Sequence, residues 1–130
     1  MTYLLLDTST PVCKVTIVTD DGVPHDHEWQ ADRGLAKGLL RYLLDTLSEY
    51  SVPVTDLKGI GVFQGPGSFT GLRIGLTVVN TLADASSIPI VGTGGDSWQD
   101  EAMMRLNRGD NDQIVMPVYG HEARITTPRK

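Results

Sequence analysis

The stretch Gly65-Pro66-Gly67-Ser68-Phe69-Thr70-Gly71-Leu72-Arg73-Ile74-Gly75 decides how this chain folds. It follows an apolar run over residues 60–63 and opens a long amphipathic segment, which predicts a strand, a glycine-rich loop and a helix N-terminus. In this geometry backbone N–H groups and the positive end of the helix dipole face outward, where they can hold an anion or a partner's polar backbone. A glycine inside a helix costs about 1 kcal/mol relative to alanine. We therefore expect another group to lie close to the backbone at Gly71 and Gly75.

The glycine-rich loop matches neither of the common nucleotide-binding fingerprints. It lacks the Lys-Ser or Lys-Thr pair of a P-loop, and Thr70 stands where the dinucleotide fingerprint has its third glycine. Two interpretations stay open. Gly65, Gly67 and Ser68 could hold a phosphate, or the glycines could only permit a tight turn and close packing of the helix.

The order of the expected elements predicts the fold class. Apolar and β-branched runs predict strands over residues 3–6, 12–18, 23–29, 60–63 and 88–91. Amphipathic segments predict helices over 31–50 and 70–85, and a third helix capped by Asp96 or Ser97. A last strand over 114–118 would pair with 119–127 as a hairpin. This order is α/β, and we predict a ribonuclease H-like (actin-like ATPase) half-domain with a mixed five-stranded sheet and flanking helices.

Polar residues follow the first strand at a position that suits ligand binding. Asp7, Thr8 and Ser9 come directly after a buried strand. This loop and the glycine-rich loop leave the carboxyl ends of neighbouring strands, where open α/β sheets bind ligands. In ATPases of this architecture such a carboxylate positions a metal or water, and the hydroxyls approach phosphates. The alternative is a cluster that only forms a turn.

Composition and charge restrict the function. The net charge of −5 disfavours direct binding to nucleic acid, which needs clustered Lys and Arg. Cys13 is the single cysteine, no apolar run approaches the ~20 residues that span a bilayer, and no leader peptide is visible at the N-terminus. We therefore expect a cytoplasmic protein without membrane contact. His25 and His27 are interpreted as an exposed pair on an edge strand rather than a metal site, and no metal site is expected.

Three segments carry a resemblance to a known family. The glycine-rich loop, the opening Leu4-Leu5-Leu6-Asp7-Thr8-Ser9-Thr10 and the run Ile88-Pro89-Ile90-Val91-Gly92 resemble the bacterial tRNA threonylcarbamoyladenosine biosynthesis proteins of the TsaB family. The resemblance extends from Met1 to about Gly92. It implies a non-catalytic subunit that pairs with the catalytic TsaD and works with the ATPase TsaE in threonylcarbamoyl transfer to adenosine 37 of tRNA. tRNA would then be contacted only indirectly.

The resemblance also implies where the partner binds. TsaB-like proteins pair through their first two helices, either with TsaD or as a homodimer. A ridge formed by Gly71 and Gly75 would allow close helix–helix approach. The implied interface residues are Leu35, Leu39, Leu43, Thr70, Gly71, Arg73, Ile74, Gly75 and Val78. No tightly bound cofactor is expected, and ATP or ADP would lie at the partner interface.

The chain also departs from the family. Leu35-Ala36 stands where family members commonly have a His-Ser pair, and we expect one domain over 1–112 with a residual hairpin and basic tail over 113–130 in place of a second domain. The alternative function is an enzyme, a peptidase or phosphotransferase that uses Asp7 and the loop from Gly65 to Gly75. No nucleophile–base pair is visible in the sequence to support it. A third interpretation is a copy that folds but has lost its partner.

Overall fold

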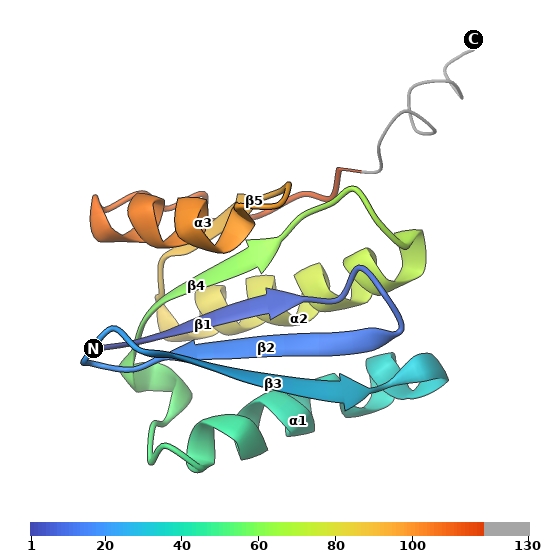
Figure 1. Cartoon of the computed structure of the whole chain (residues 1–130), viewed down its shortest axis with the longest axis horizontal. Coiled ribbons are helices and arrows are strands. Elements are labelled where there is room, and N and C mark those ends of the chain that lie inside the picture. Colours follow the sequence, from blue (N-terminus) through green and yellow to red (C-terminus); the bar gives the residue numbers. More distant parts are fainter. Residues whose placement is uncertain (119–130) are drawn as a thin grey trace, which may run out of the picture.

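A computed structural model describes residues 1–118 of the chain. Its centre is a five-stranded sheet in the order β3-β2-β1-β4-β5 (Figure 1). The strands are β1 (Thr2–Asp7), β2 (Val12–Val18), β3 (Pro24–Gln30), β4 (Leu57–Phe63) and β5 (Ile90–Thr93). β1, β2 and β3 pair antiparallel, whereas β4 and β5 run parallel to β1. The sheet is therefore mixed, and the predicted ribonuclease H-like α/β fold is confirmed.

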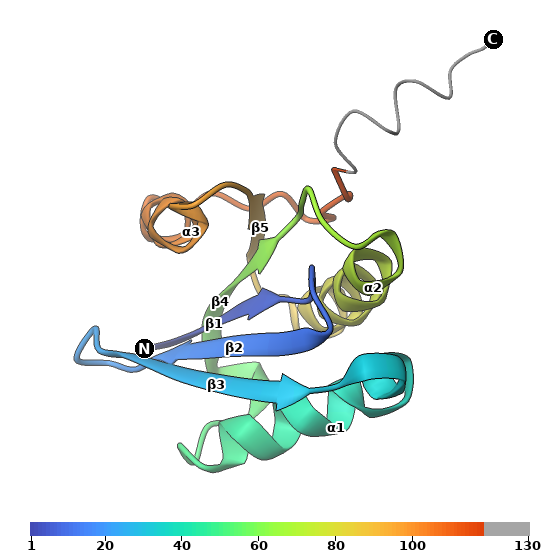
Figure 2. The ribbon, with the colours of Figure 1, turned by 45° about the vertical axis from the view of Figure 1, so that its right-hand side comes forward.

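Three helices cover the two faces of the sheet. They are α1 (Leu35–Ser48), α2 (Phe69–Ser86) and α3 (Trp98–Asn107). Figure 2 shows α1 and α2 on one face of the sheet and α3 on the other. Short 3-10 turns over Asp32–Gly34 and Val54–Asp56 precede α1 and β4.

The main core lies between the sheet and the helices α1 and α2. Alternate residues of β1 and β2, such as Leu4, Leu6 and Val15, point to this face and are almost fully buried. Within residues 1–118, β3 pairs with β2 alone and forms the predicted sheet edge, with half-buried and exposed residues alternating along it. At about 1.5–3 kcal/mol for each large apolar side chain that is fully buried, this layer dominates the stability of the fold.

The second layer is smaller. Trp98, Ala102 and Leu106 of α3 pack against Tyr3 and Leu5 of the sheet. The helix begins after Ser97, as predicted, but the Ser97 side chain makes no capping hydrogen bond. α3 lies over β4 and β5, and the outward residues of β3 on this face stay exposed.

The segment after α3 differs from the sequence prediction. Residues 114–118 form no strand, although a strand was predicted there. Residues 111–118, here called the strap, instead run in an irregular path beside β5 and α2. The strap makes single hydrogen bonds rather than a ladder: Asp112 N–H donates to Ile90 O at 2.7 Å, and Val118 N–H donates to Gln64 O at 2.7 Å. The predicted pairing with 119–127 lies outside the described residues.

Candidate functional site

The structure brings together the two loops that the sequence singled out. The loop after β1 and the loop between β4 and α2 leave neighbouring strands and pack against each other. The Ser68 N–H donates a hydrogen bond to Ser9 O at 2.9 Å. The buried Thr8 hydroxyl donates to Gly71 O at 2.7 Å. The two loops therefore form one structural unit at the carboxyl end of β1 and β4.

The glycines of this unit accommodate the chain's own residues. A Cβ atom at Gly67 would lie 2.5 Å from Cβ of Ser9, and a Cβ at Gly71 would overlap the carbonyl oxygen of Thr8. A Cβ at Gly75 would overlap the Thr8 hydroxyl. The close approach that the glycines allow is thus used by Thr8 and Ser9.

This geometry corrects one expectation about the partner surface. The ridge of Gly71 and Gly75 was expected to face a partner helix. The ridge packs against Thr8 instead, and Gly75 is buried, whereas Gly71 is half-buried and also borders a hollow at the surface. The cost of glycine inside α2 is explained by packing within the fold.

The polar side chains of the two loops serve local roles. Asp7 Oδ1 accepts a hydrogen bond from the Ser9 N–H at 2.8 Å, which closes a turn after β1. Ser68 is the N-cap of α2, and its hydroxyl oxygen accepts from the Gly71 N–H at 3.4 Å. These contacts favour the interpretation of Gly65–Ser68 as a structural turn that starts α2.

Three of the leucines assigned to the partner surface are instead part of the core. Leu35, Leu39 and Leu43 lie against the sheet and are almost fully buried. The reason is the angle between positions on a helix, because residues four apart share one narrow stripe and the sheet takes that stripe. Leu39 and Leu43 therefore do not reach the outer surface of α1, whereas Leu35 still borders a hollow at the start of α2.

The residues beside that stripe remain accessible. Leu40 and Leu44 of α1 are 47% and 41% exposed. Ala36 lies one turn before them and is also exposed. These three residues form an apolar line along the outer side of α1. Beside it, Arg41 and Asp45 form an exposed ion pair four residues apart. The interface residues expected on α1 were Leu35, Leu39 and Leu43, whereas the exposed leucines of this helix are Leu40 and Leu44.

A hollow lies between this side of α1 and the outer side of α2. Its volume is about 330 Å³, and its lining is mostly apolar. A second hollow of about 660 Å³ continues it towards the start of α2 and shares Thr70 and Ile74 with it. The lining of the first hollow is Ala36, Thr70, Arg73, Ile74, Thr77 and Val78. Of the predicted interface residues, Thr70, Arg73, Ile74 and Val78 border the first hollow, and Leu35 and Gly71 border the second. The two hollows together are here called the α1–α2 groove.

The rim of the α1–α2 groove is polar. Arg33 borders the second, larger hollow, and Arg73 of α2 borders the first. The guanidinium of Arg73 also lies over the Phe69 ring, 5.2 Å from its centroid. An apolar floor with a charged rim is the usual composition of a protein–protein interface.

Two sets of titratable side chains lie elsewhere in the fold: the single Cys13, and His25 with His27 beside Tyr50. Burial, and secondarily the charge of Asp7, raises the pKa of the Cys13 thiol to about 12. His25 and His27 were expected to be exposed, but they are half-buried against Tyr50, and His27 Nε2 lies 2.5 Å from the Tyr50 hydroxyl. Neither set provides an activated nucleophile.

Within residues 1–118 we find no group of three or more His, Cys, Asp or Glu side chains that could hold a metal ion. The helices of this part of the chain are also too short or too polar to cross a bilayer.

Sequence reasoning missed an ion-pair cluster next to β5. Arg105 of α3 contacts Asp110 at 3.0 Å and both carboxylate oxygens of Asp112, at 2.5 and 3.1 Å. Hydrogen bonds from Arg108 and Arg105 lower the pKa of Asp110. Burial acts to raise the pKa of Asp112, but the hydrogen bonds from Arg105 and from the Gly92 N–H outweigh it, so the net shift is downward. The signal was the alternation of Arg and Asp over 105–112, which was interpreted only as a polar loop.

Comparison with known proteins identifies related chains. A family model described as "TsaD: tRNA N6-adenosine threonylcarbamoyltransferase" matches residues 29–93. The curated "tRNA threonylcarbamoyladenosine biosynthesis protein TsaB" of Escherichia coli is 33% identical over 92 residues, which are 71% of this chain and 39% of that protein. Its namesake in Bacillus subtilis is 32% identical over 119 residues, 92% of this chain and 50% of that protein.

A solved structure agrees with these matches. "YeaZ from Pseudomonas aeruginosa" superposes with a TM-score of 0.66 at 36% identity, covering 72% of this chain and 43% of that one. The chain therefore spans about half the length, or less, of these relatives.

Proposed function

This chain belongs to the TsaB family, and from that premise we propose that it is a non-catalytic subunit which supports threonylcarbamoyl transfer to adenosine 37 of tRNA. It does so by pairing with a TsaD-like catalytic subunit. The observation that carries the proposal is the α1–α2 groove, which Ala36 lines, together with Leu40 and Leu44, which are exposed one and two turns further along α1. An exposed apolar line beside an apolar hollow is typical of a surface that another protein covers.

The match to the transferase family favours TsaD as the partner. The matched residues, 29–93, contain the whole of α1 and α2, which together form the groove. The partner therefore carries a segment related to this one. Two related segments can pair around an approximate two-fold axis, in which each presents the same surface to the other, as identical subunits do in an isologous dimer. The same geometry makes a homodimer through α1 and α2 the competing assembly.

The negative net charge of the chain is consistent with a role in which the chain itself does not bind tRNA. A protein with net charge −5 gains little from releasing the counterions of a phosphate backbone. We propose that the partner subunit contacts the tRNA and that a TsaE-like ATPase acts on the complex. The site of this assembly would be the cytoplasm.

An enzymatic function is the alternative. A neighbouring structure from Pseudomonas aeruginosa is described as similar to the peptidase YeaZ. In this chain, however, the Ser68 hydroxyl caps α2 and Asp7 closes a turn. Neither contact prepares a nucleophile or a phosphoryl transfer. A nucleotide, ATP or ADP, at the partner interface stays a prediction of the family resemblance.

A double substitution on α1 tests the pairing. Leu40→Asp with Leu44→Asp places two charges on the exposed apolar line, and both sites are accessible enough for the fold to persist. If each leucine contributes about 1–2 kcal/mol to the interface, affinity for TsaD of the same organism falls by about 30-fold or more. Binding is measured by titration calorimetry, and unfolding in urea confirms that the variant folds.

The matched control is Met104→Asp on α3, which is 56% exposed on the other face of the sheet. It should bind TsaD as the parent does. Unchanged binding by the Leu40→Asp/Leu44→Asp variant would contradict the assignment. Peptide cleavage by the purified chain, lost in Ser68→Ala, would favour the peptidase instead.

A further inference from the structure

We propose that the loop of Asn111 and Asp112, tied to α3 by Arg105, is a removable cover over the outer edge of β5. Opening this cover lets β5 pair with β5 of a second copy of the chain. The edge of β5 is not part of the α1–α2 groove, so the proposal does not depend on the function proposed above.

β5 is the last strand of the sheet, and its outer edge presents backbone groups that β4 does not bind. On the side of β4, Thr93 O accepts a hydrogen bond from the Gln64 N–H at 2.9 Å. Because residues alternate along a parallel strand, the N–H and C=O groups of Ile90 and Gly92 point the other way. Within residues 1–118, no strand lies beside this edge. A row of such groups is a template on which another chain can form a strand.

Residues that follow β5 in the chain bind all four of these outward groups. Asn111 Oδ1 accepts a hydrogen bond from the Ile90 N–H at 3.1 Å, and Ile90 O accepts one from the Asp112 N–H at 2.7 Å. The Gly92 N–H donates to the Asp112 carboxylate at 2.9 Å, and Gly92 O accepts from the Arg105 guanidinium at 3.2 Å. Three of the four partners are therefore side chains, at positions where a further strand would supply its backbone.

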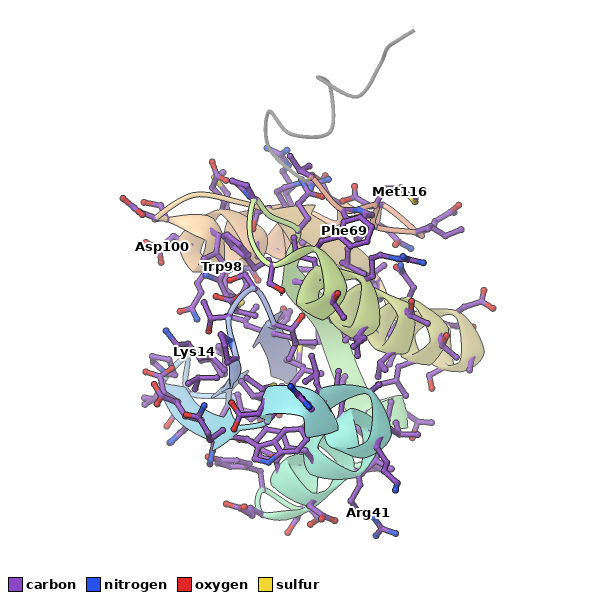
Figure 3. The ribbon with its side chains drawn as sticks, turned by 90° about the vertical axis from the view of Figure 1, so that its right-hand side faces the viewer. Lys14, Arg41, Phe69, Trp98, Asp100 and Met116 are labelled. Carbon is purple, nitrogen blue, oxygen red and sulfur yellow. The ribbon has the colours of Figure 1, made fainter. Side chains whose placement is uncertain are left out.

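Polar contacts at the surface hold the cover in place. Arg105 binds the two carboxylate oxygens of Asp112 at 2.5 and 3.1 Å, and both side chains are partly exposed. Asn111 and Asp112 are exposed residues, and the next buried apolar residue is Val115. Figure 3 shows Met116, further along the strap, at the surface of the molecule. The loop can therefore move outward without displacing a helix or strand of residues 1–118.

The charges of the two sheet edges favour a second copy as the occupant at β5. β5 carries no charged residue over Ile90–Thr93, so two copies of it can pair antiparallel without bringing like charges together. β3, at the other edge, has exposed Asp26 and Glu28, and pairing of β3 with itself would place carboxylates side by side. Two identical edges paired antiparallel around a two-fold axis form an isologous contact, which closes as a dimer.

The contacts of Asp112 make the cover sensitive to acid. Its carboxylate faces Arg105 of α3 and the Gly92 N–H of β5. Asp110 lies in the same loop, and Asp84 of α2 borders a hollow that the loop also lines. Burial acts to raise the pKa of Asp112, but the hydrogen bonds from Arg105 and Gly92 outweigh it and lower the pKa. The contribution of Asp112 to closure is therefore present at neutral pH and is lost as the pH falls through the lowered pKa.

Asp112→Ala tests the cover, because it removes the acceptor of the Gly92 N–H and a partner of Arg105. All proteins compared also carry Leu40→Asp/Leu44→Asp, which prevents association through the α1–α2 groove. In dilute solution, the protection factor of the Gly92 amide against hydrogen exchange should fall by about tenfold or more, while that of Val91, which faces β4, is unchanged. At high concentration, sedimentation velocity should show a dimer, in which the Gly92 amide is protected again.

Asp110→Ala is the matched control, because the Asp110 carboxylate binds Arg105 and Arg108 and not β5. It should remain monomeric, with Gly92 protected. Urea unfolding checks that each variant folds. If Asp112→Ala does not fold, the protein with Asp112 intact is measured at pH of about 3, where the same opening and dimer are expected. The proposal is overturned if Gly92 stays protected when the cover should be open, if the opened protein stays monomeric, or if the dimer leaves the Gly92 amide unprotected.

Discussion

The substitution Gly75→Ala tests whether glycine at this position is needed for packing inside the fold or for contact with a partner. By helix propensity alone, alanine at this position would stabilise α2 by about 1 kcal/mol. The structure predicts the opposite sign. The new Cβ would overlap the Thr8 hydroxyl and lie 3.0 Å from Thr8 Cγ2. Thr8 is 1% exposed and its hydroxyl is bonded to Gly71 O, so it cannot turn away freely.

The size of the effect follows from three contributions. Overpacking of a buried site costs about 1–3 kcal/mol. Moving Thr8 would break its hydrogen bond to Gly71 O, at about 1 kcal/mol more. Subtracting the gain in helix propensity leaves a net loss of about 1–3 kcal/mol in the free energy of unfolding. In the double variant Thr8→Ala/Gly75→Ala the overlapping atoms are absent, and we expect a favourable coupling of about 1 kcal/mol or more.

Urea unfolding of the four proteins in this cycle gives the required free energies. Gly34→Ala is the matched control, because no atom lies within 4 Å of a Cβ built there. It should change stability by less than about 0.5 kcal/mol. The reasoning is refuted if Gly75→Ala is as stable as the parent, or if the cycle shows no coupling with Thr8. Gly75 would then be free to serve a partner surface.

Two further predictions concern the strap and the buried thiol. Arg105→Ala should lower stability at pH 7 by about 1–2 kcal/mol, since its ion pairs are partly exposed. The pKa values of Asp110 and Asp112 are lowered in the fold, so this stabilisation is present at neutral pH and is lost as the pH falls below about 4. Urea unfolding at pH 7 and pH 3 should therefore show the two proteins converging in acid, and a constant difference would contradict the ion-pair assignment. Burial raises the pKa of the Cys13 thiol to about 12, so Cys13 should react with iodoacetamide at pH 8 only as fast as the protein unfolds. Rapid labelling of the native protein would instead show that the Cys13 thiol is accessible.

The sheet and its helices could be predicted from the sequence because their local patterns are strong. The β-branched run over 12–18 and the apolar run over 60–63 both lie within strands, and the helix boundaries differ from the prediction by a few residues at most. The glycine-rich stretch marked the start of α2 to within one residue. Periodicity along one segment is enough for these assignments.

The choice between the two apolar stripes of α1 could not be predicted in the same way. Leu35, Leu39 and Leu43 are equivalent in hydrophobicity to Leu40 and Leu44. Which stripe is buried depends on how the helix is rotated on the sheet, and that is set by tertiary contacts. One such contact is the approach of Trp29 to Gly38, where a Cβ would lie 2.8 Å from the indole ring.

The strap could not be predicted because its contacts are single and non-local. The run Ile114-Val115-Met116-Pro117-Val118 has the composition of a strand. Its partners are the Asn80 side chain and the Gln64 carbonyl, which lie 35 and 54 positions earlier in the chain, the latter counted from Val118. No local pattern indicates that side chains, rather than a neighbouring strand, will bind this backbone.

The most direct test of the proposed role is reconstituted modification of tRNA. The chain is mixed with TsaD and TsaE of the same organism, the threonylcarbamoyl-adenylate synthase, ATP, threonine, bicarbonate and tRNA, and threonylcarbamoyladenosine is quantified by mass spectrometry of the digested tRNA. We predict that modification requires this chain, persists with Met104→Asp, and falls sharply with Leu40→Asp/Leu44→Asp. Modification at the same rate with and without the chain would contradict the account.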